Sequence, residues 1–212
     1  DTVPGDTDAS SSATDAAIVE EDPAFFSFMK GEAVLDAVRF ASAFFGEGQF
    51  ESEELARTDE GFELSQELRG PYYQPFPPEA LSGEGALTEM NQDDRDETEV
   101  QHLEQTASIR RDGNRFVLEL SVTGTAGVPV AVEMGFRREG ELSSVQAVEG
   151  TDDAYLLAEG YGSYECGGRR ITFGPGRADH RWIKLRGAEP KLDLSSVYLT
   201  GYTPFEHTIG IR

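Results

Sequence analysis

The sequence predicts a mainly β protein: an antiparallel β-sandwich of the jelly-roll or supersandwich type, with one α-helix packed near its N-terminal side. Two observations favour the sandwich. From residue 100 onward, apolar and polar residues alternate in short runs, and glycine-containing turns separate the runs at spacings of roughly ten residues. No internal repeat of about 20 to 50 residues is present, which argues against a propeller or a solenoid.

The charge is distributed unevenly along the 212 residues. The chain has a net charge of -22, and its first 99 residues contain 25 acidic and 5 basic side chains, against 15 and 13 in the remainder. Lysine is scarce, with 3 residues beside 15 arginines, a balance that suits a halophilic or high-GC source. Because this negative charge repels phosphate groups, nucleic acid is not an expected partner. No apolar run is long enough to span a membrane.

Residues 1–24 are expected to form an acidic arm or linker. They contain seven acidic residues and no basic one, in a texture rich in serine, threonine and alanine. Such a segment buries too little apolar surface to fold alone. It is therefore a candidate contact with neighbouring protein chains, and nothing in it resembles a signal peptide.

Residues 25–99 are expected to form a helix and an acidic irregular region, both packed on the sandwich. Apolar residues recur at steps of three and four, which predicts a helix over 31–45 that ends at Gly46. A short strand is expected over 62–68, and the prolines of 71–78 forbid regular pairing. The residues that carry the helical pattern are Val34, Leu35, Val38, Ala41, Phe44 and Phe45.

The acidic stretch 91–99 is interpreted first as a solvated loop, because runs of charge usually face water. A calcium loop is the alternative, since carboxylate oxygens are the ligands that this ion prefers. The spacing does not match an EF-hand, so no cofactor is predicted and calcium is the single cation kept open. Its candidate ligands are Asp93, Asp94, Asp96 and Glu97.

Residues 100–212 are expected to form the sandwich itself. A hairpin turns at Asp112 and Gly113, between alternating runs over 103–109 and 116–122, and a further strand follows over 128–136. Glu133 falls on the polar side of that strand and is expected to face solvent. Further strands are expected over 142–149, 154–159, 161–166, 169–174, 180–186, 196–200 and 206–212.

Motifs for catalysis are missing from the sequence. It contains no nucleophile elbow, no phosphate-binding loop and no zinc-protease motif. Cys166 has no histidine near it in sequence, which favours a structural role over a catalytic thiol. His102, His180 and His207 lie on separate predicted strands, and their spacing gives no support to a metal site. We therefore predict no catalytic residue and favour a protein without enzymatic activity, while that activity is left open.

One stretch is basic in this acidic chain. Residues 167–191 contain seven lysines and arginines against two acidic residues, together with the only tryptophan. On a strand over 180–186, alternate side chains would share a face and could stack a sugar ring and pair its carboxylate or sulfate. The alternative is that the tryptophan or Ile183 fills the core while the basic residues neutralise local acids. The candidate ligand-binding residues are Arg177, His180, Trp182, Lys184 and Arg186.

Four segments of the second half, VPVAVEMGF, YLLAEGYGSYECGGRRITFGPG, HRWIKLRGAEP and SVYLTGYTPFEHTIGIR, carry a family resemblance. This region resembles the β-sandwich of heparinase II/III-like polysaccharide lyases and of galactose-mutarotase-like supersandwich domains. In such lyases the catalytic groups lie largely on a helical toroid domain, which this chain lacks. The resemblance therefore implies a non-catalytic, carbohydrate-associated sandwich, and no catalytic residue is transferred.

The expected function is thus a carbohydrate-associated domain of an exported or cell-surface protein that contacts anionic polysaccharide. Two alternatives remain open at this point. One is a structural subunit of an extracellular assembly, such as a surface layer, fibre or filament, joined through residues 1–24. The other is part of a polysaccharide lyase or hydrolase.

Overall fold

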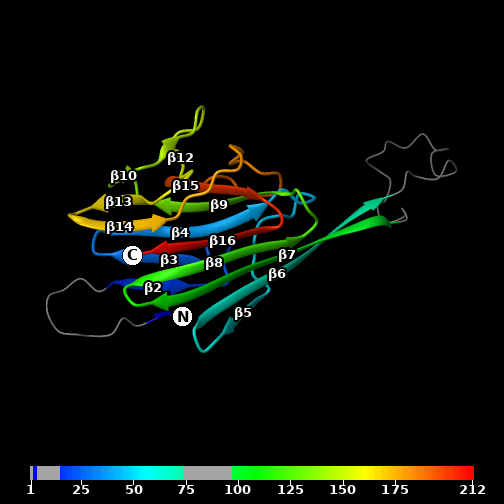
Figure 1. Ribbon diagram of the computed structural model, residues 1–212, viewed down its shortest axis with the longest axis horizontal. Coiled ribbons are helices and arrows are strands. Elements are labelled where there is room, and N and C mark those ends of the chain that lie inside the picture. Colours follow the sequence, from blue (N-terminus) through cyan, green and yellow to red (C-terminus); the bar gives the residue numbers. More distant parts are fainter. Residues whose placement is uncertain (1, 4–14, 74–96) are drawn as a thin grey trace.

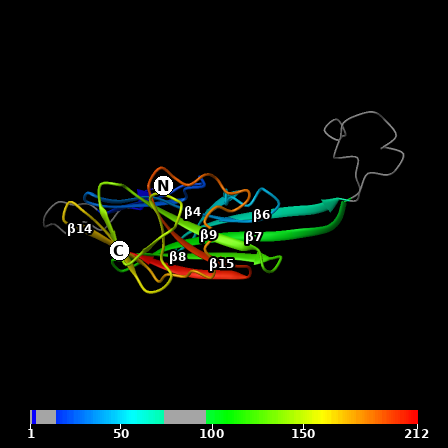
Figure 2. The same ribbon diagram turned by 90° about the horizontal axis from the view of Figure 1, so that it is seen from above.

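The computed structural model describes residues 2–3, 15–73 and 97–212. Within these ranges the chain forms two eight-stranded sheets that pack face to face, and no helix is present. Figures 1 and 2 show the two layers, with a pair of long strands projecting from one end. The mainly β sandwich expected from the sequence is confirmed. Accordingly, no helix in these ranges could cross a membrane.

The first sheet, sheet A, has its longest strands at its centre and short strands at both edges. All its neighbouring strands are antiparallel except β12 and β15, which run parallel. In spatial order its strands are β1 (Thr2–Val3), β2 (Ala16–Val19), β3 (Phe26–Lys30), β4 (Ala33–Ser42), β9 (Pro129–Phe136), β15 (Ser195–Tyr202), β12 (Ala154–Leu156) and β11 (Gln146–Ala147).

The second sheet, sheet B, is antiparallel throughout and contains the two longest strands, β6 and β7. In spatial order its strands are β10 (Glu141–Ser143), β13 (Gly162–Cys166), β14 (Arg169–Gly174), β16 (Phe205–Ile211), β8 (Arg115–Gly124), β7 (Glu97–Asp112), β6 (Gly61–Tyr73) and β5 (Glu54–Arg57).

The core lies between the sheets and is built from alternate residues of each strand, because successive side chains of a strand point to opposite faces. One large apolar cluster joins both layers. Aromatic rings dominate it: Phe40 stacks on Phe50 at 4.4 Å, and Phe136 lies 4.8 Å from Phe173 of the opposite sheet. Every second residue of the central strands is thereby committed to packing.

The helix predicted over 31–45 is wrong, since residues 33–42 form the central strand β4. A β-bulge between Leu35 and Ala37 shifts the register, so the inward-facing residues step from Leu35 to Val38, three positions on. Both faces of the strand are also buried, which makes its apolar run continuous. A bulged strand buried on both sides imitates the helical spacing.

Most strands predicted for the second half are confirmed. β7 and β8 form the hairpin that turns at Asp112 and Gly113, and β9 occupies 129–136. The strand predicted over 62–68 lies within β6. The strand predicted over 180–186 is wrong, because residues 175–194 form an irregular segment between β14 and β15, with one isolated bridge at Ala178.

Part of the predicted acidic arm belongs to the sandwich. Residues 16–19 form β2, which pairs with β3 of the same chain, and Ala17 and Val19 are buried in the common core. Sheet A of the same chain therefore orders this piece of the arm, without a partner surface.

The calcium interpretation falls mostly on residues that the structure leaves undescribed, since Asp93, Asp94 and Asp96 lie in 74–96. Glu97 is described, and its carboxylate pairs with Arg69 of the neighbouring strand β6. The guanidinium of Arg69 lowers the pKa of Glu97. Over residues 2–3, 15–73 and 97–212, no group of three metal-ligating side chains gathers closely enough to hold a metal ion.

Candidate functional site

The predicted ligand-binding residues lie on the irregular segment, and the structure brings only two of them into contact. The indole of Trp182 stacks on the imidazole of His180, with ring centroids 5.4 Å apart and an angle of 30° between the planes. His180 is buried, whereas Trp182 is 59% exposed. A local hydrogen bond supports the contact, because the backbone N–H of Trp182 donates to Nδ1 of His180 at 3.2 Å.

The other three predicted residues lie apart from this pair. The guanidinium of Arg177 lies 5.0 Å from the centre of the Phe205 ring and forms an ion pair with Asp179. Lys184 lines a cavity on the outer side of sheet A. Arg186 is exposed. The structure therefore contains no single face that carries all five residues.

The cavity beside Lys184, of about 500 Å³, lies where residues 183–191 cover β4, β9 and β15. At its base Arg39 of β4 forms a buried ion pair of 2.7 Å with Glu133 of β9. The expectation that Glu133 faces solvent is wrong, because the irregular segment covers the outer face of sheet A.

The oxygens of Glu133 are fully engaged. Besides Arg39, the carboxylate accepts hydrogen bonds from the hydroxyl of Ser196 at 2.6 Å and from the backbone N–H of Leu192 at 3.2 Å. Arg39 in turn donates to Glu189 and to the carbonyl of Pro190. A buried charge whose bonds are all made inside the protein has nothing left for a ligand, so this cluster fastens the segment to the sheet.

A second groove, of about 570 Å³, lies on the outer face of sheet B. Its floor is a row of paired residues across four neighbouring strands: Arg110 of β7 opposite Val117 of β8, Val117 opposite Gly210 of β16, and Gly210 opposite Gly174 of β14. Gly210 has no side chain to fill the space above it, whereas the space beside Gly174 is occupied by the backbone of Gly160 and by Tyr161. A hollow therefore forms in an otherwise continuous sheet face.

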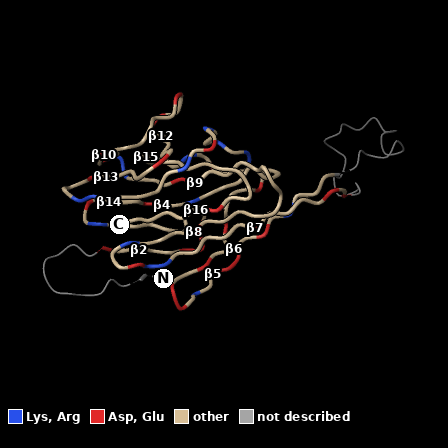
Figure 3. Tube along the Cα trace, viewed as in Figure 1, with Lys and Arg blue, Asp and Glu red and all other residues tan. Residues whose placement is uncertain are grey.

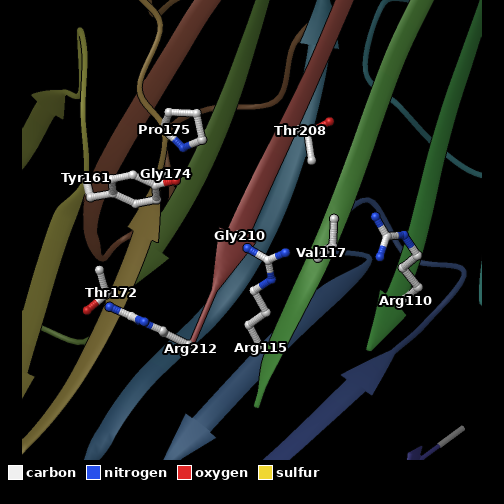
Figure 4. A pocket seen from close by; sticks show the side chains of 10 residues that line it. All are labelled: Arg110, Arg115, Val117, Tyr161, Thr172, Gly174, Pro175, Thr208, Gly210 and Arg212. Atoms are coloured by element: carbon white, nitrogen blue, oxygen red, sulfur yellow. The ribbon is translucent and has the colours of Figure 1, made fainter. Parts of the chain in front are cut away.

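Arginines line the side of this groove, as Figure 4 shows. Arg115 and Arg212 come from β8 and from the end of β16, and Arg110 comes from β7. Arg110 forms an ion pair with Glu119 at 3.0 Å, and Arg115 pairs with Asp112 at 2.5 Å. Arg115 lowers the pKa of the Asp112 carboxyl by hydrogen bonding and by its charge. Arg212 makes no ion pair with any residue in the described ranges.

Tyr161 closes the other side of the groove. Its ring is 60% exposed and lies beside Gly174 and Pro175, at the start of the irregular segment (Figure 4). The hydroxyls of Thr172 and Thr208 add hydrogen-bonding groups on the same face. The groove thus combines a flat floor, an exposed aromatic ring, hydroxyls and guanidinium groups, which together suit a ligand with both apolar C–H surface and negative charge.

The position of this groove contrasts with the charge of the whole chain. Figure 3 shows acidic residues recurring along β5 and β6, whereas three arginines meet at the groove. Glu119 and Asp112 balance two of these arginines, so the net positive charge at the groove comes from Arg212, in a chain of net charge -22.

Sequence reasoning missed this groove because its residues are up to about one hundred positions apart in the chain. The signal was present only in part: Thr208, Gly210 and Arg212 alternate on the face of β16 opposite to the buried Ile209 and Ile211. The strand order β14-β16-β8-β7 brings them beside Arg110 and Arg115, and no local pattern gives that order. Comparison with family models, with curated proteins and with solved structures finds no match for this chain.

Proposed function

We propose that this protein is a non-catalytic binding domain for acidic carbohydrate, with uronate or sulfated sugars bound in the arginine-lined groove on sheet B. The single observation that supports this proposal most is the grouping of Arg110, Arg115 and Arg212 around a glycine floor, beside the exposed ring of Tyr161. The exported or cell-surface location and the likeness to the sandwich of polysaccharide lyases belong to the same proposal.

The chemistry of the groove fits a sugar acid on two counts. Guanidinium groups bind carboxylates and sulfates through paired hydrogen bonds, and an aromatic ring packs against the C–H face of a pyranose. The ion pairs of Arg110 and Arg115 are exposed, and such pairs contribute only about 0–1 kcal/mol, so a ligand can compete for them. Arg212 has no such pair to break within the described residues.

The negative net charge of the chain opposes the binding of an acidic glycan. A protein this acidic repels polyanions at long range, so an acidic glycan binds only where local cations outweigh the overall field. We therefore expect selective binding at the groove, with little adsorption to the remaining surface.

Calorimetric titration with oligogalacturonate and with a neutral β-glucan oligosaccharide of equal length tests the proposal. The acidic oligosaccharide should bind and the neutral one should bind at least tenfold more weakly. The double variant Arg115→Gln, Arg212→Gln should lower the affinity for the acidic ligand roughly tenfold or more, because two charge-assisted contacts are lost.

The matched control is Arg57→Gln, Arg137→Gln, which removes the same charge from β5 and from the outer side of sheet A. This pair should leave the affinity almost unchanged. An equal loss in both double variants would show that only net charge matters. The absence of binding to oligogalacturonate and to a sulfated oligosaccharide alike would overturn the proposal.

A further inference from the structure

His180, Trp182 and Tyr202 form a second surface, called here the aromatic platform. Trp182 stacks on His180 and meets the Tyr202 ring edge-on, with centroids 6.4 Å apart and planes at 90°. His180 and Tyr202 are themselves in edge contact at 4.9 Å. One face of the indole is thus supported by protein, while the side chain remains more than half exposed.

The ring beneath the tryptophan is held rigidly. Nε2 of His180 lies 3.0 Å from the carbonyl oxygen of Gly201, and Nδ1 accepts the backbone N–H of Trp182 at 3.2 Å. These partners fix a neutral imidazole with its proton on Nε2. The main chain of His180 is fastened as well, because its carbonyl accepts the hydroxyl of Thr200 at 2.5 Å. The platform is therefore fixed before any ligand arrives, although His180 and Trp182 lie outside regular secondary structure.

The surroundings of the platform are cationic. Arg181, Lys184 and Arg186 are all exposed on the same short segment. Most other arginines of the chain are neutralised by a carboxylate, as Arg137 is by Asp36 and Arg138 by Asp153 and Asp193. No ion pair forms at Arg181, Lys184 or Arg186 within the part of the chain that the structure describes. An exposed ring flanked by unpaired cations suits a ligand that presents both C–H surface and negative charge.

A protein partner would require a larger surface. Arginine and tryptophan are enriched at protein interfaces, so the charges beside Trp182 do not decide between a protein and a glycan, and the size of the apolar surface does. The exposed apolar surface here is a single supported ring, which is too small for a protein docking patch. Its size and support match one pyranose ring.

We propose that the aromatic platform is a second contact for acidic glycan, in which the C–H face of a pyranose stacks on Trp182 while the flanking cations pair with its carboxylate or sulfate. This inference rests on the proposed function but involves a different surface. The groove lies on the outer face of sheet B, whereas the platform is fastened to β15 of sheet A. A polymer that reaches both contacts would bind more tightly than a fragment that fills one of them.

Trp182 is the only tryptophan of the chain, so its fluorescence reports on this surface alone. Titration of the full chain with oligogalacturonate should change the emission in a saturable manner, and the groove variant Arg115→Gln, Arg212→Gln should retain that change. The variant Arg181→Gln, Lys184→Gln, Arg186→Gln should weaken it. By calorimetry, Trp182→Ala should lower the affinity roughly fivefold, the contribution of one stacked ring.

Tyr72→Ala provides the matched control, because Tyr72 is an aromatic side chain of similar exposure on β6. It should leave both the emission change and the affinity unaltered. Thermal unfolding followed by circular dichroism checks that the Trp182 variant is folded, and the emission titration of the unmodified chain tests the platform even if that variant fails to fold.

The outcomes separate the two proposals. Calorimetric binding that the groove variant abolishes, without any emission change in the unmodified chain, overturns the platform and leaves the groove intact. An emission change with equal affinity for neutral and acidic oligosaccharides overturns the role of the flanking cations. If neither method detects glycan binding, both proposals are overturned.

Discussion

The outer faces of the two sheets differ although both belong to one sandwich. On sheet A, residues 183–191 cover the central strands, and the charges beneath them, Arg39 and Glu133, are buried and fully hydrogen-bonded. On sheet B the corresponding face is open, and the charges around its glycine floor are exposed. The covered charges hold the chain together, whereas the open ones are available to a ligand.

The comparison shows why charge alone is a poor guide to a binding site. Arg39 and Arg115 both contact a carboxylate. Arg39 is buried and its hydrogen bonds are all made inside the protein, although a cavity adjoins it. Arg115 faces open space and has a weak, solvent-screened partner in Asp112. Burial and complete hydrogen bonding, rather than free volume, distinguish the Arg39–Glu133 cluster from the candidate site on sheet B.

The largest expected effect comes from breaking the buried pair. Glu133→Gln leaves the Arg39 guanidinium without its buried counter-charge, although Glu189 remains beside it. We expect the free energy of unfolding to fall by about 3 kcal/mol, as for other buried pairs that lose one partner. Chemical denaturation measures this loss. Asp36→Asn, which breaks the exposed pair with Arg137, should cost less than about 1 kcal/mol, and equal losses would refute the distinction between the two faces.

The open face can be closed without unfolding the protein. A Cβ on Gly210 would lie 3.6 Å from the carbonyl oxygen of Gly174, an ordinary contact, and Gly210 does not adopt a positive φ. Gly210→Val should therefore keep the fold, place its side chain over the groove floor and reduce affinity for acidic oligosaccharide roughly tenfold. Calorimetry compares it with the unmodified chain. Undiminished binding would place the ligand elsewhere.

Acid should weaken the attachment of the irregular segment to sheet A. Burial is the main cause that lowers the pKa of His180 below its ordinary value of 6.5. The folded state therefore takes up this proton less readily than the unfolded chain, so its contribution to stability is complete above about pH 6.5 and is lost as the pH falls through the lowered pKa. Protonation of Nδ1 also removes the acceptor for Trp182.

Unfolding by denaturant at pH 7.5 and at pH 5 measures the effect. The unmodified chain should lose more stability between these two conditions than the His180→Gln variant does. Comparing the two losses removes the contribution of the many carboxylates that both chains share. Equal losses would show that His180 does not couple this segment to pH.

The smallest effect concerns the glycine floor itself. Glycine within a strand costs about 0.5–1 kcal/mol relative to alanine, through its larger conformational freedom in the unfolded state. Because Gly210 has room for a methyl group, Gly210→Ala should raise the free energy of unfolding by about 0.5 kcal/mol. Gly174 has a φ of 138°, and alanine there should destabilise. Chemical denaturation should therefore show that Gly210→Ala stabilises the protein and Gly174→Ala destabilises it. This result would show that packing does not require glycine at position 210, where it keeps the groove open.

Local patterns were sufficient for the parts of the fold that depend on neighbouring residues. The Asp112-Gly113 turn and the alternation on either side of it predict β7 and β8. They failed at β4, where the bulge after Leu35 replaces a step of two by a step of three. They failed at Glu133 as well, because its burial depends on a segment more than fifty residues further along the chain.

The candidate sites show the same division. The contact between His180 and Trp182 follows from their separation of two residues, although a local hydrogen bond supports it and the segment forms no strand. Arg110 and Arg212 lie about a hundred residues apart, and only the order of four strands brings them to one groove. That order results from packing of the complete chain, and no segment contains it.

The projecting strands have a consequence for how the molecule opens. Residues 97–102 of β7 pair with β6 alone, because β8 joins only from Leu103 onward. A ribbon two strands wide, with no third neighbour, has little of its own to resist fraying. The amides of this ribbon should exchange with solvent through local opening while the sandwich stays folded. The sandwich then unfolds as one cooperative unit, and the ribbon opens independently of it.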